Sequence, residues 1–179
     1  MIAIVYGSSL GNTQDAAEAI AAALNSHEVA TTLINVATIK RDLTPLLAYD
    51  TLLLGCSTWN IGELQDDWYD AFPLFQKLDL MGKRVGLFGC GDQFGYPDTF
   101  QDALGILAKA AIASGATLVG RWPTEGYDLY ESLGVEDGMF FGLAIDDDNQ
   151  DKLTAGRIER WVGQLVGELR GEASQVAVQ

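Results

Sequence analysis

Short apolar runs alternate with segments of helical periodicity along the chain, and this alternation constrains the fold more than any other feature. Apolar runs of this kind are typical of strands that are buried on both faces of a parallel sheet. Five strands are predicted, at Ile2 to Tyr6, Ala30 to Asn35, Thr51 to Gly55, Val85 to Gly89 and Ala116 to Gly120. The rhythm of strands and helices predicts an α/β fold.

The segments between these runs carry apolar residues three and four positions apart, which is the stripe of a helix lying on a sheet. The stripes are Ala16, Ala19, Ile20, Ala23 and Leu24, then Phe100, Ala103, Leu104, Leu107 and Ala111, and finally Ile158, Trp161, Val162, Leu165 and Leu169. We expect the last of these helices to close the fold.

One segment breaks the rhythm, because residues 121–138 show no helical period before the apolar run from Met139 to Ile145. A loop of that length inside a compact domain is usually functional or forms a small sheet of its own. We interpret it as an insertion that splits the fifth strand. The chain of 179 residues otherwise fits a single domain, residues 1–171, followed by a polar tail, residues 172–179.

The chain is strongly acidic, with 25 Asp and Glu against 11 Lys and Arg and a formal net charge of −14. This charge repels nucleic acid and anionic membrane surfaces and suits cationic patches on protein partners. No apolar run approaches the roughly 20 residues of a membrane span, and Met1 to Tyr6 carries no export signal. Cys56 and Cys90 form no C-x-x-C pair, and no metal-binding pattern is present, so we expect packing roles and a cytoplasmic location.

The loop after the first predicted strand, Gly7 to Thr13, opens the first helix. Its small residues let backbone N–H groups converge on an anion, and Ser8, Ser9 and Thr13 add hydroxyl donors. The loop lacks the lysine and the spacing of a Walker A motif, which argues against nucleotide hydrolysis. A capped strand-to-helix turn explains the same residues, so the loop alone leaves both interpretations open.

Two further loops follow the third and fourth predicted strands, and each offers an aromatic side chain. Trp59 lies in the loop from Cys56 to Glu63, and Tyr96 lies in the loop from Cys90 to Asp98. Ligands in open parallel sheets bind beyond the carboxyl ends of the strands. The two aromatic side chains could therefore form opposite walls of a pocket and hold a planar ring between them.

With these motifs in view, the chain resembles the long-chain flavodoxins of bacterial type over nearly its whole length. The most specific motifs are Thr58 to Leu64 (TWNIGEL) and Gly91 to Tyr96 (GDQFGY), supported by Trp122 to Tyr127 and Gly142 to Gln150. The resemblance implies a three-layer sandwich, with a five-stranded parallel sheet in the order 2-1-3-4-5 and helices on both faces. The insertion is the feature that separates long-chain from short-chain members.

The resemblance also implies non-covalently bound FMN and a set of residues that hold it. Carried over by position, the cofactor-binding residues are Ser8, Ser9, Leu10, Gly11, Asn12, Thr13, Ser57, Thr58, Trp59, Asn60, Ile61, Gly62, Cys90, Gly91, Asp92, Tyr96, Thr99, Gln101 and Asp148. The first six would hold the phosphate, and Trp59 and Tyr96 would flank the isoalloxazine. Asp92 would face the polar edge of the ring, with Thr58 and Asp148 toward the ribityl chain.

Two positions depart from the family pattern. Leu10 stands where members commonly carry Thr, so one phosphate-side hydroxyl is missing, and Thr99 stands where relatives often carry Asn. We expect phosphate binding to survive the first change through the backbone donors, with a loss of roughly 1 to 3 kcal/mol.

The function implied is that of a low-potential one-electron carrier, which shuttles between semiquinone and hydroquinone and is not an enzyme. The Asn60–Ile61 peptide would rotate on reduction and present its carbonyl to flavin N5, so Trp59, Asn60, Ile61 and Tyr96 would tune the redox chemistry. The partners would be a ferredoxin/flavodoxin-NADP reductase or another donor and low-potential acceptor enzymes. We expect a monomer that docks through Asp66, Asp67 and Asp70.

The main alternative is an FMN enzyme of flavodoxin-like fold, such as an NAD(P)H-quinone oxidoreductase. Such an enzyme needs open space over the flavin, whereas Trp59 and Tyr96 are expected to occupy both faces of the ring. A flavin-free phosphorelay receiver of the same topology is disfavoured, because the acidic pair after the first strand and the phosphorylatable Asp after the third are missing.

Overall fold

The computed structural model describes residues 1–171, and the predicted polar tail lies outside the described residues. Its centre is a parallel sheet in the order β2-β1-β3-β6, and the last position is shared by β7 and β11, which both pair with β6. These strands are β1 (Ile2–Tyr6), β2 (Thr31–Asn35), β3 (Thr51–Gly55), β6 (Arg84–Cys90), β7 (Thr117–Leu118) and β11 (Leu143–Ile145). The predicted fold class and strand order are therefore confirmed.

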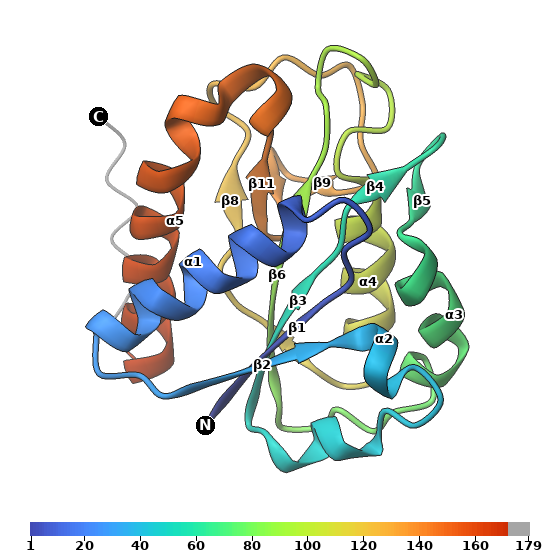
Figure 1. Ribbon diagram of the computed structural model, residues 1–179, viewed down its shortest axis with the longest axis vertical. Helices are drawn as coiled ribbons and strands as arrows, with labels where there is room; N and C mark the ends of the chain where they lie inside the picture. The colour runs from blue at the N-terminus through green and yellow to red at the C-terminus, as the bar shows by residue number, and fades with distance from the viewer. Residues whose placement is uncertain (172–179) are drawn as a thin grey trace.

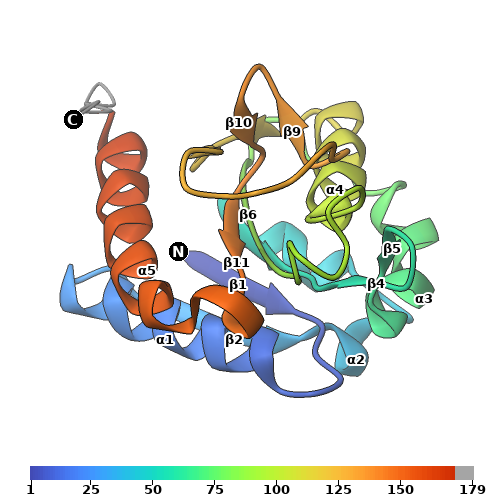
Figure 2. The same cartoon turned by 90° about the horizontal axis from the view of Figure 1, so that it is seen from above.

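Helices cover both faces of this sheet and give the molecule three layers (Figures 1 and 2). On one face, α1 (Asn12–Ser26) packs along α5 (Asp147–Arg170). The other face carries α3 (Asp66–Phe75) and α4 (Asp102–Ala113). Two short segments, α2 (Val36–Ile39) and the 3-10 helix η1 (Thr44–Ala48), connect β2 to β3.

The central strands are buried on both faces because successive side chains of a strand point to opposite sides. In β1, Ile4 joins the core beneath α1 and α5, whereas Val5 joins the core beneath α3 and α4. Leu53 and Leu54 divide in the same way in β3. Each core thus draws on every second residue, which explains the nearly continuous apolar runs of the sequence.

The insertion forms a small antiparallel sheet of its own between the two halves of the split strand. β10 (Met139–Phe140) pairs with both β8 (Trp122–Pro123) and β9 (Val135–Glu136). The apolar run that begins at Met139 therefore contributes to two sheets. Its first two residues form β10 of the small sheet, and its last three form β11 of the central sheet.

Aromatic packing ties the insertion to the main core. The Tyr127 ring lies 5.2 Å from the Phe140 ring and 5.9 Å from the Phe100 ring, centroid to centroid. The Tyr127 hydroxyl donates to the carbonyl of Ala144 in β11 at 2.6 Å and accepts from the Trp122 indole N–H at 3.0 Å. The insertion is therefore part of the packed fold.

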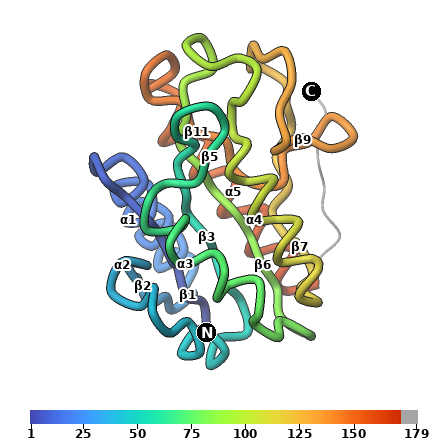
Figure 3. The backbone as a smooth tube through the Cα atoms, turned by 90° about the vertical axis from the view of Figure 1, so that its right-hand side faces the viewer, coloured from blue at the N-terminus to red at the C-terminus, as the bar shows by residue number. Residues whose placement is uncertain are grey.

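The carboxyl ends of the parallel strands lie at one end of the molecule, opposite the N-terminus (Figures 1 and 3). The chain runs from β1 to β2 on one side and then returns to β3 on the other side of β1, so the order of strands reverses at this point. In open α/β sheets, a ligand binds in the crevice beyond such a reversal.

Candidate functional site

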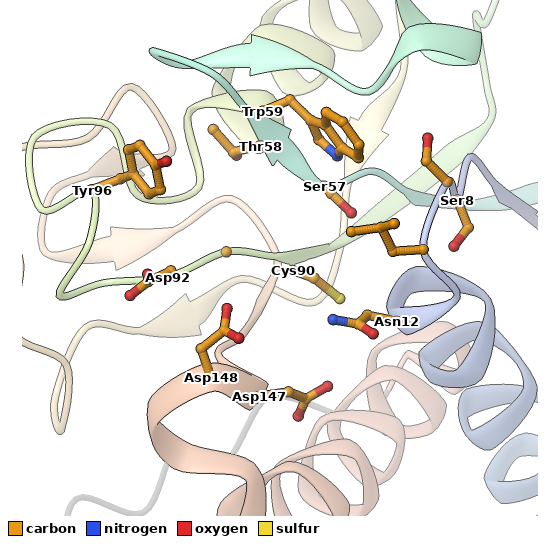
Figure 4. A pocket seen from close by; sticks show the side chains of 13 residues that line it. Ser8, Asn12, Ser57, Thr58, Trp59, Cys90, Asp92, Tyr96, Asp147 and Asp148 are labelled. Carbon is orange, nitrogen blue, oxygen red and sulfur yellow. The ribbon is translucent and has the colours of Figure 1, made fainter.

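A pocket lies at this end of the sheet, between the loops that follow β1, β3 and β6 and the start of α5 (Figure 4). Its lining is Ser8, Ser9, Leu10, Asn12, Ser57, Thr58, Trp59, Cys90, Gly91, Asp92, Tyr96, Asp147 and Asp148. All of these except Asp147 belong to the set inferred from the sequence. The structure thus brings together residues from four separate parts of the chain.

The first wall is the N-terminus of α1, where Gly11 occupies the N-cap position with φ 105°. A side chain at Gly11 would be strained at this angle, and no side-chain cap bonds to the described helix start. The first N–H groups of a helix have no partner within the helix, so they are available to an anion. Ser8 Oγ accepts from the Gly11 N–H at 3.1 Å, and Leu10 is 83% exposed at the rim.

Polar contacts connect this wall to its neighbours. The hydroxyls of Thr13 and Ser57 lie 2.5 Å apart and join the first and second loops. Ser9 Oγ accepts from the amide of Gln65, a buried residue that also caps α3. Thr13 is itself buried, so it shapes the first loop and lies outside the pocket lining.

The second wall is a hairpin of β4 (Thr58–Trp59) and β5 (Glu63–Leu64). Trp59 is half-buried in the pocket, and Thr58 Oγ1 accepts from the Ala103 N–H at 3.2 Å. At the tip, Asn60 has φ 49° and its amide donates to the Glu63 carboxylate at 2.6 Å. Asn60 thus adopts the left-handed backbone conformation that glycine reaches most freely.

Glycine is required at position 62 for two reasons. Gly62 has φ 84°, and a Cβ placed there would lie 2.5 Å from the Asp102 carboxylate. Ile61 is 85% exposed at the hairpin tip. Asn60, Ile61 and Gly62 therefore form the turn that carries Trp59, and they lie outside the pocket lining.

The third wall is the loop after β6, which is folded around Asp92. Its carboxylate accepts from the N–H groups of Gly95 at 2.8 Å and Phe94 at 3.1 Å and from the Asn149 amide at 2.8 Å. These bonds, with the Gly95 N–H first, hold the pKa of Asp92 below its usual range. Tyr96 borders the pocket and is 55% exposed.

Gln93 joins this third wall to the insertion and to α5, and the sequence analysis missed it. Its side chain is fully buried; the amide donates to the Asp146 carboxylate at 2.6 Å, and its oxygen accepts from the Asp128 N–H at 2.7 Å. Asp146 is also fully buried and caps α5 by accepting from the Asn149 N–H. The sequence signal available was a pair of polar residues following two apolar strands.

The start of α5 gives the pocket an acidic border. Asp147 and Asp148 both line it, close to Asp92 (Figure 4). Desolvation, followed by repulsion from Asp92, Asp146 and Asp147, raises the pKa of Asp148. Added negative charge is therefore disfavoured at this edge of the pocket.

Two further predicted binding residues also lie outside the pocket lining. Gln101 is fully buried with φ 66°, and its amide donates to the carbonyls of Gly89 and Ile145 at 3.0 and 3.2 Å. It braces β6 against β11 and does not line the pocket. Thr99 is half-buried and precedes α4, also outside the lining.

Both cysteines are buried and unbridged. Burial is the first cause that raises the pKa of each thiol to about 12. Cys90 borders the pocket, whereas Cys56 lies in the core beneath α3 and α4. A protonated, buried thiol is a poor nucleophile, which agrees with the expected packing role.

The described residues hold no group of three or more His, Cys, Asp or Glu that could bind a metal. Among the helices of residues 1–171, none is long and apolar enough to cross a membrane.

The fold and site together define a doubly wound α/β protein that holds a ligand at the carboxyl edge of its sheet. Residues 4–161 match the family model for flavodoxin. Flavodoxin from Picosynechococcus sp. is 46% identical over 164 residues, covering 92% of this chain and 95% of the relative. Flavodoxin 1 of Escherichia coli is 47% identical over 167 residues, covering 93% of each chain.

Solved structures agree with this match. A Fusobacterium nucleatum flavodoxin bound to flavin mononucleotide superimposes with a TM-score of 0.86 at 29% identity, covering 93% of this chain and 97% of that one. A point mutant of a flavodoxin from the same organism, also bound to flavin mononucleotide, gives a TM-score of 0.87 at 30% identity, covering 93% and 95%. The chain belongs to the flavodoxin family, whose members are electron-transfer proteins.

Proposed function

We propose that this chain binds FMN non-covalently and carries single electrons at low potential, as a long-chain flavodoxin whose residues 1–171 form one FMN-binding domain. The observation that carries the proposal is the uncapped N-terminus of α1, which shares one pocket with Trp59 and Tyr96. An anion site beside two aromatic side chains suits a ligand with a phosphate at one end and a planar ring at the other.

The donors of the pocket fit a phosphate without a cation. No Lys or Arg lines the described pocket, so the donors near the α1 N-terminus are its N–H groups, the hydroxyls of Ser8 and Ser9 and the side-chain amide of Asn12. The Ser57 hydroxyl borders the same region and is held by Thr13. Recognition through backbone and hydroxyl donors is typical of phosphates at helix N-termini.

FMN supplies the one-electron chemistry when bound, and the protein sets how readily added charge is accepted. Trp59 and Tyr96 keep water from the ring by stacking. Asp92, with its lowered pKa, stays an acceptor, and Asp147 and Asp148 add negative charge nearby. A carboxylate 10 Å away contributes roughly 0.4 kcal/mol in a water-like dielectric, so several must act together to lower the potential.

The turn beside Trp59 is the proposed redox-sensitive segment. Its tip is exposed at Asn60 and Ile61, so the peptide between them can rotate without disturbing the core. A carbonyl turned toward the ring would accept a hydrogen bond from protonated flavin N5.

We propose that the donor is a ferredoxin/flavodoxin-NADP reductase or a similar enzyme, and that a cytoplasmic monomer docks through the acidic side of α3. Two of the three predicted docking carboxylates are already paired, because the Lys40 ammonium binds Asp67 at 3.0 Å and Asp70 at 2.8 Å. Asp66 is exposed, so it is the acidic residue of this group most open to a cationic partner.

The test is anaerobic stepwise reduction of the FMN-loaded protein, followed by visible absorption. The carrier function predicts two separate one-electron steps, with a long-wavelength band that rises and then falls. Bleaching in one two-electron step, with rapid NAD(P)H turnover, would contradict it and favour a quinone oxidoreductase. Riboflavin should bind far more weakly than FMN; equal affinities would exclude the α1 N-terminus as the phosphate site.

A further inference from the structure

A second groove lies between the insertion and α5, and its lining includes both residues of β8. Figure 1 shows β8 beside α5. The volume of the groove is 660 Å³, within the range of small-molecule sites, and it shares no lining residue with the pocket at the carboxyl edge. Trp122 and Gly126 line it from the insertion, and Lys152, Arg157 and Arg160 line it from α5. Three cations thus gather in one place on a chain with only 11 Lys and Arg.

Arg157 is the central residue of this groove, because its charge is buried and forms no ion pair with a carboxylate of residues 1–171. It is 5% exposed, and its guanidinium carbon lies 4.1 Å from the centroid of the Tyr127 ring. Nη1 is buried and has no hydrogen-bond partner among the described residues. Nη2 lies toward Gly126, 4.0 Å from where a Cβ would stand. A buried cation is costly unless an anion compensates it.

The two other cations are exposed at the edge of the groove. Arg160 lies over the Trp122 ring, with its guanidinium carbon 5.1 Å from the centroid, and Lys152 is exposed at the rim. Glu125 and Glu159 also line the groove, but neither forms an ion pair within residues 1–171. The aromatic rings hold the two guanidinium groups in place, and neither guanidinium forms an ion pair among the described residues.

We propose that this groove binds a phosphate-bearing anion, with Arg157 as its main ligand and Arg160 and Lys152 at the rim. Guanidinium groups bind phosphate through paired N–H donors, and prior ordering by stacking reduces the entropy lost on binding. The groove is larger than one phosphate group needs. A polyphosphate and the diphosphate of a nucleotide are two sources of the same chemistry.

An occupied groove would fasten the insertion to α5. Only one hydrogen bond joins Gly126 to α5 among the contacts described, from the Gln150 amide to the Gly126 carbonyl at 2.9 Å. Gln150 interrupts the helical geometry of α5 with φ −135°, just after Asp147 and Asp148. The anion would bridge the same two elements beyond this interruption.

The test titrates pyrophosphate into FMN-loaded protein at low ionic strength and follows the Trp122 indole resonance by NMR. FMN occupies the first pocket, so phosphate at the α1 N-terminus does not contribute. We expect saturable binding that weakens at least tenfold in Arg157→Met and several-fold in Arg160→Gln and Lys152→Gln. Lys77→Gln, which removes an exposed cation beyond α3, is the matched control and should leave the affinity unchanged.

ADP in place of pyrophosphate distinguishes the two sources. Tighter binding of ADP identifies a nucleotide, and equal or weaker binding identifies a polyphosphate. If Arg157→Met does not fold, the double variant Lys152→Gln/Arg160→Gln decides. A titration without saturation, or equal weakening in Lys77→Gln, would overturn the proposal. Because FMN retention is measured separately by absorption, failure here is distinguishable from failure of the carrier function.

Discussion

Replacing Leu10 by threonine tests directly how the α1 N-terminus recognises phosphate. Leu10 lines the pocket but is 83% exposed, so replacing it loses little buried apolar area. A hydroxyl at this position would add one donor to a site that has backbone N–H groups and the Ser8 and Ser9 hydroxyls. The substitution therefore changes phosphate recognition with little effect on folding.

The expected gain follows from the exposure of the site. A hydrogen bond to a charged group contributes about 1.5 to 3 kcal/mol, and solvent screening at the rim reduces this to about 1 to 2 kcal/mol. At about 1.4 kcal/mol for each factor of ten, Leu10→Thr should lower the Kd for FMN roughly 5- to 30-fold.

The assay is the quenching of flavin fluorescence on titration into FMN-free protein. Leu10→Val is the matched control, because valine has the shape of threonine without the hydroxyl. Riboflavin is the second control, because it lacks the phosphate. An equal gain in Leu10→Val, or for riboflavin, would refute the assignment of this loop to the phosphate.

Three further predictions concern the supports of the site. Asn60→Ala should destabilise FMN-free protein by about 1 kcal/mol in urea unfolding, because alanine is strained at φ 49°, whereas Asn60→Gly should not; equal losses would point to the bond to Glu63 instead. Tyr127→Phe should cost about 1 to 3 kcal/mol through two lost hydrogen bonds. Burial raises the pKa of Tyr127 to about 12, so its contribution is complete below the unfolded pKa of about 10 and should fall as pH rises toward 12; a Tyr127→Phe difference that is constant across this range would contradict the assignment. Cys56 and Cys90 should resist alkylation at pH 8 while folded and react after denaturation; rapid labelling of the folded protein would show that the thiols are accessible.

The sequence predicts the central sheet well because each strand is buried on both faces, which leaves an apolar run that can be recognised without a partner. The strands of the insertion are harder to predict. β8, β9 and β10 are two residues each, too short to show a period, and their pairing depends on contacts between distant segments. The last helix stripe, by contrast, is long enough to be recognised in isolation.

The three walls of the pocket were predicted because each loop follows a strand that the sequence defines. The polar supports were not, because their partners are far away in the chain. Gln93 meets Asp146 across 53 positions, and Lys40 meets Asp70 across 30. Gln101 was assigned to the cofactor by position in the family resemblance, and nothing in the sequence indicates its positive φ or its buried position.

The buried amide of Gln93 also bears on how the long form of the fold could be shortened in evolution. Removing the insertion would take away the Asp128 N–H to which its oxygen is bonded and leave that oxygen buried without a donor. Such a loss costs about 1 to 3 kcal/mol. The rings of Phe100 and Phe140 would also lose their contacts with Tyr127, which would add to this cost. A viable deletion would therefore require an accompanying substitution at position 93, which makes the insertion difficult to lose in a single genetic step.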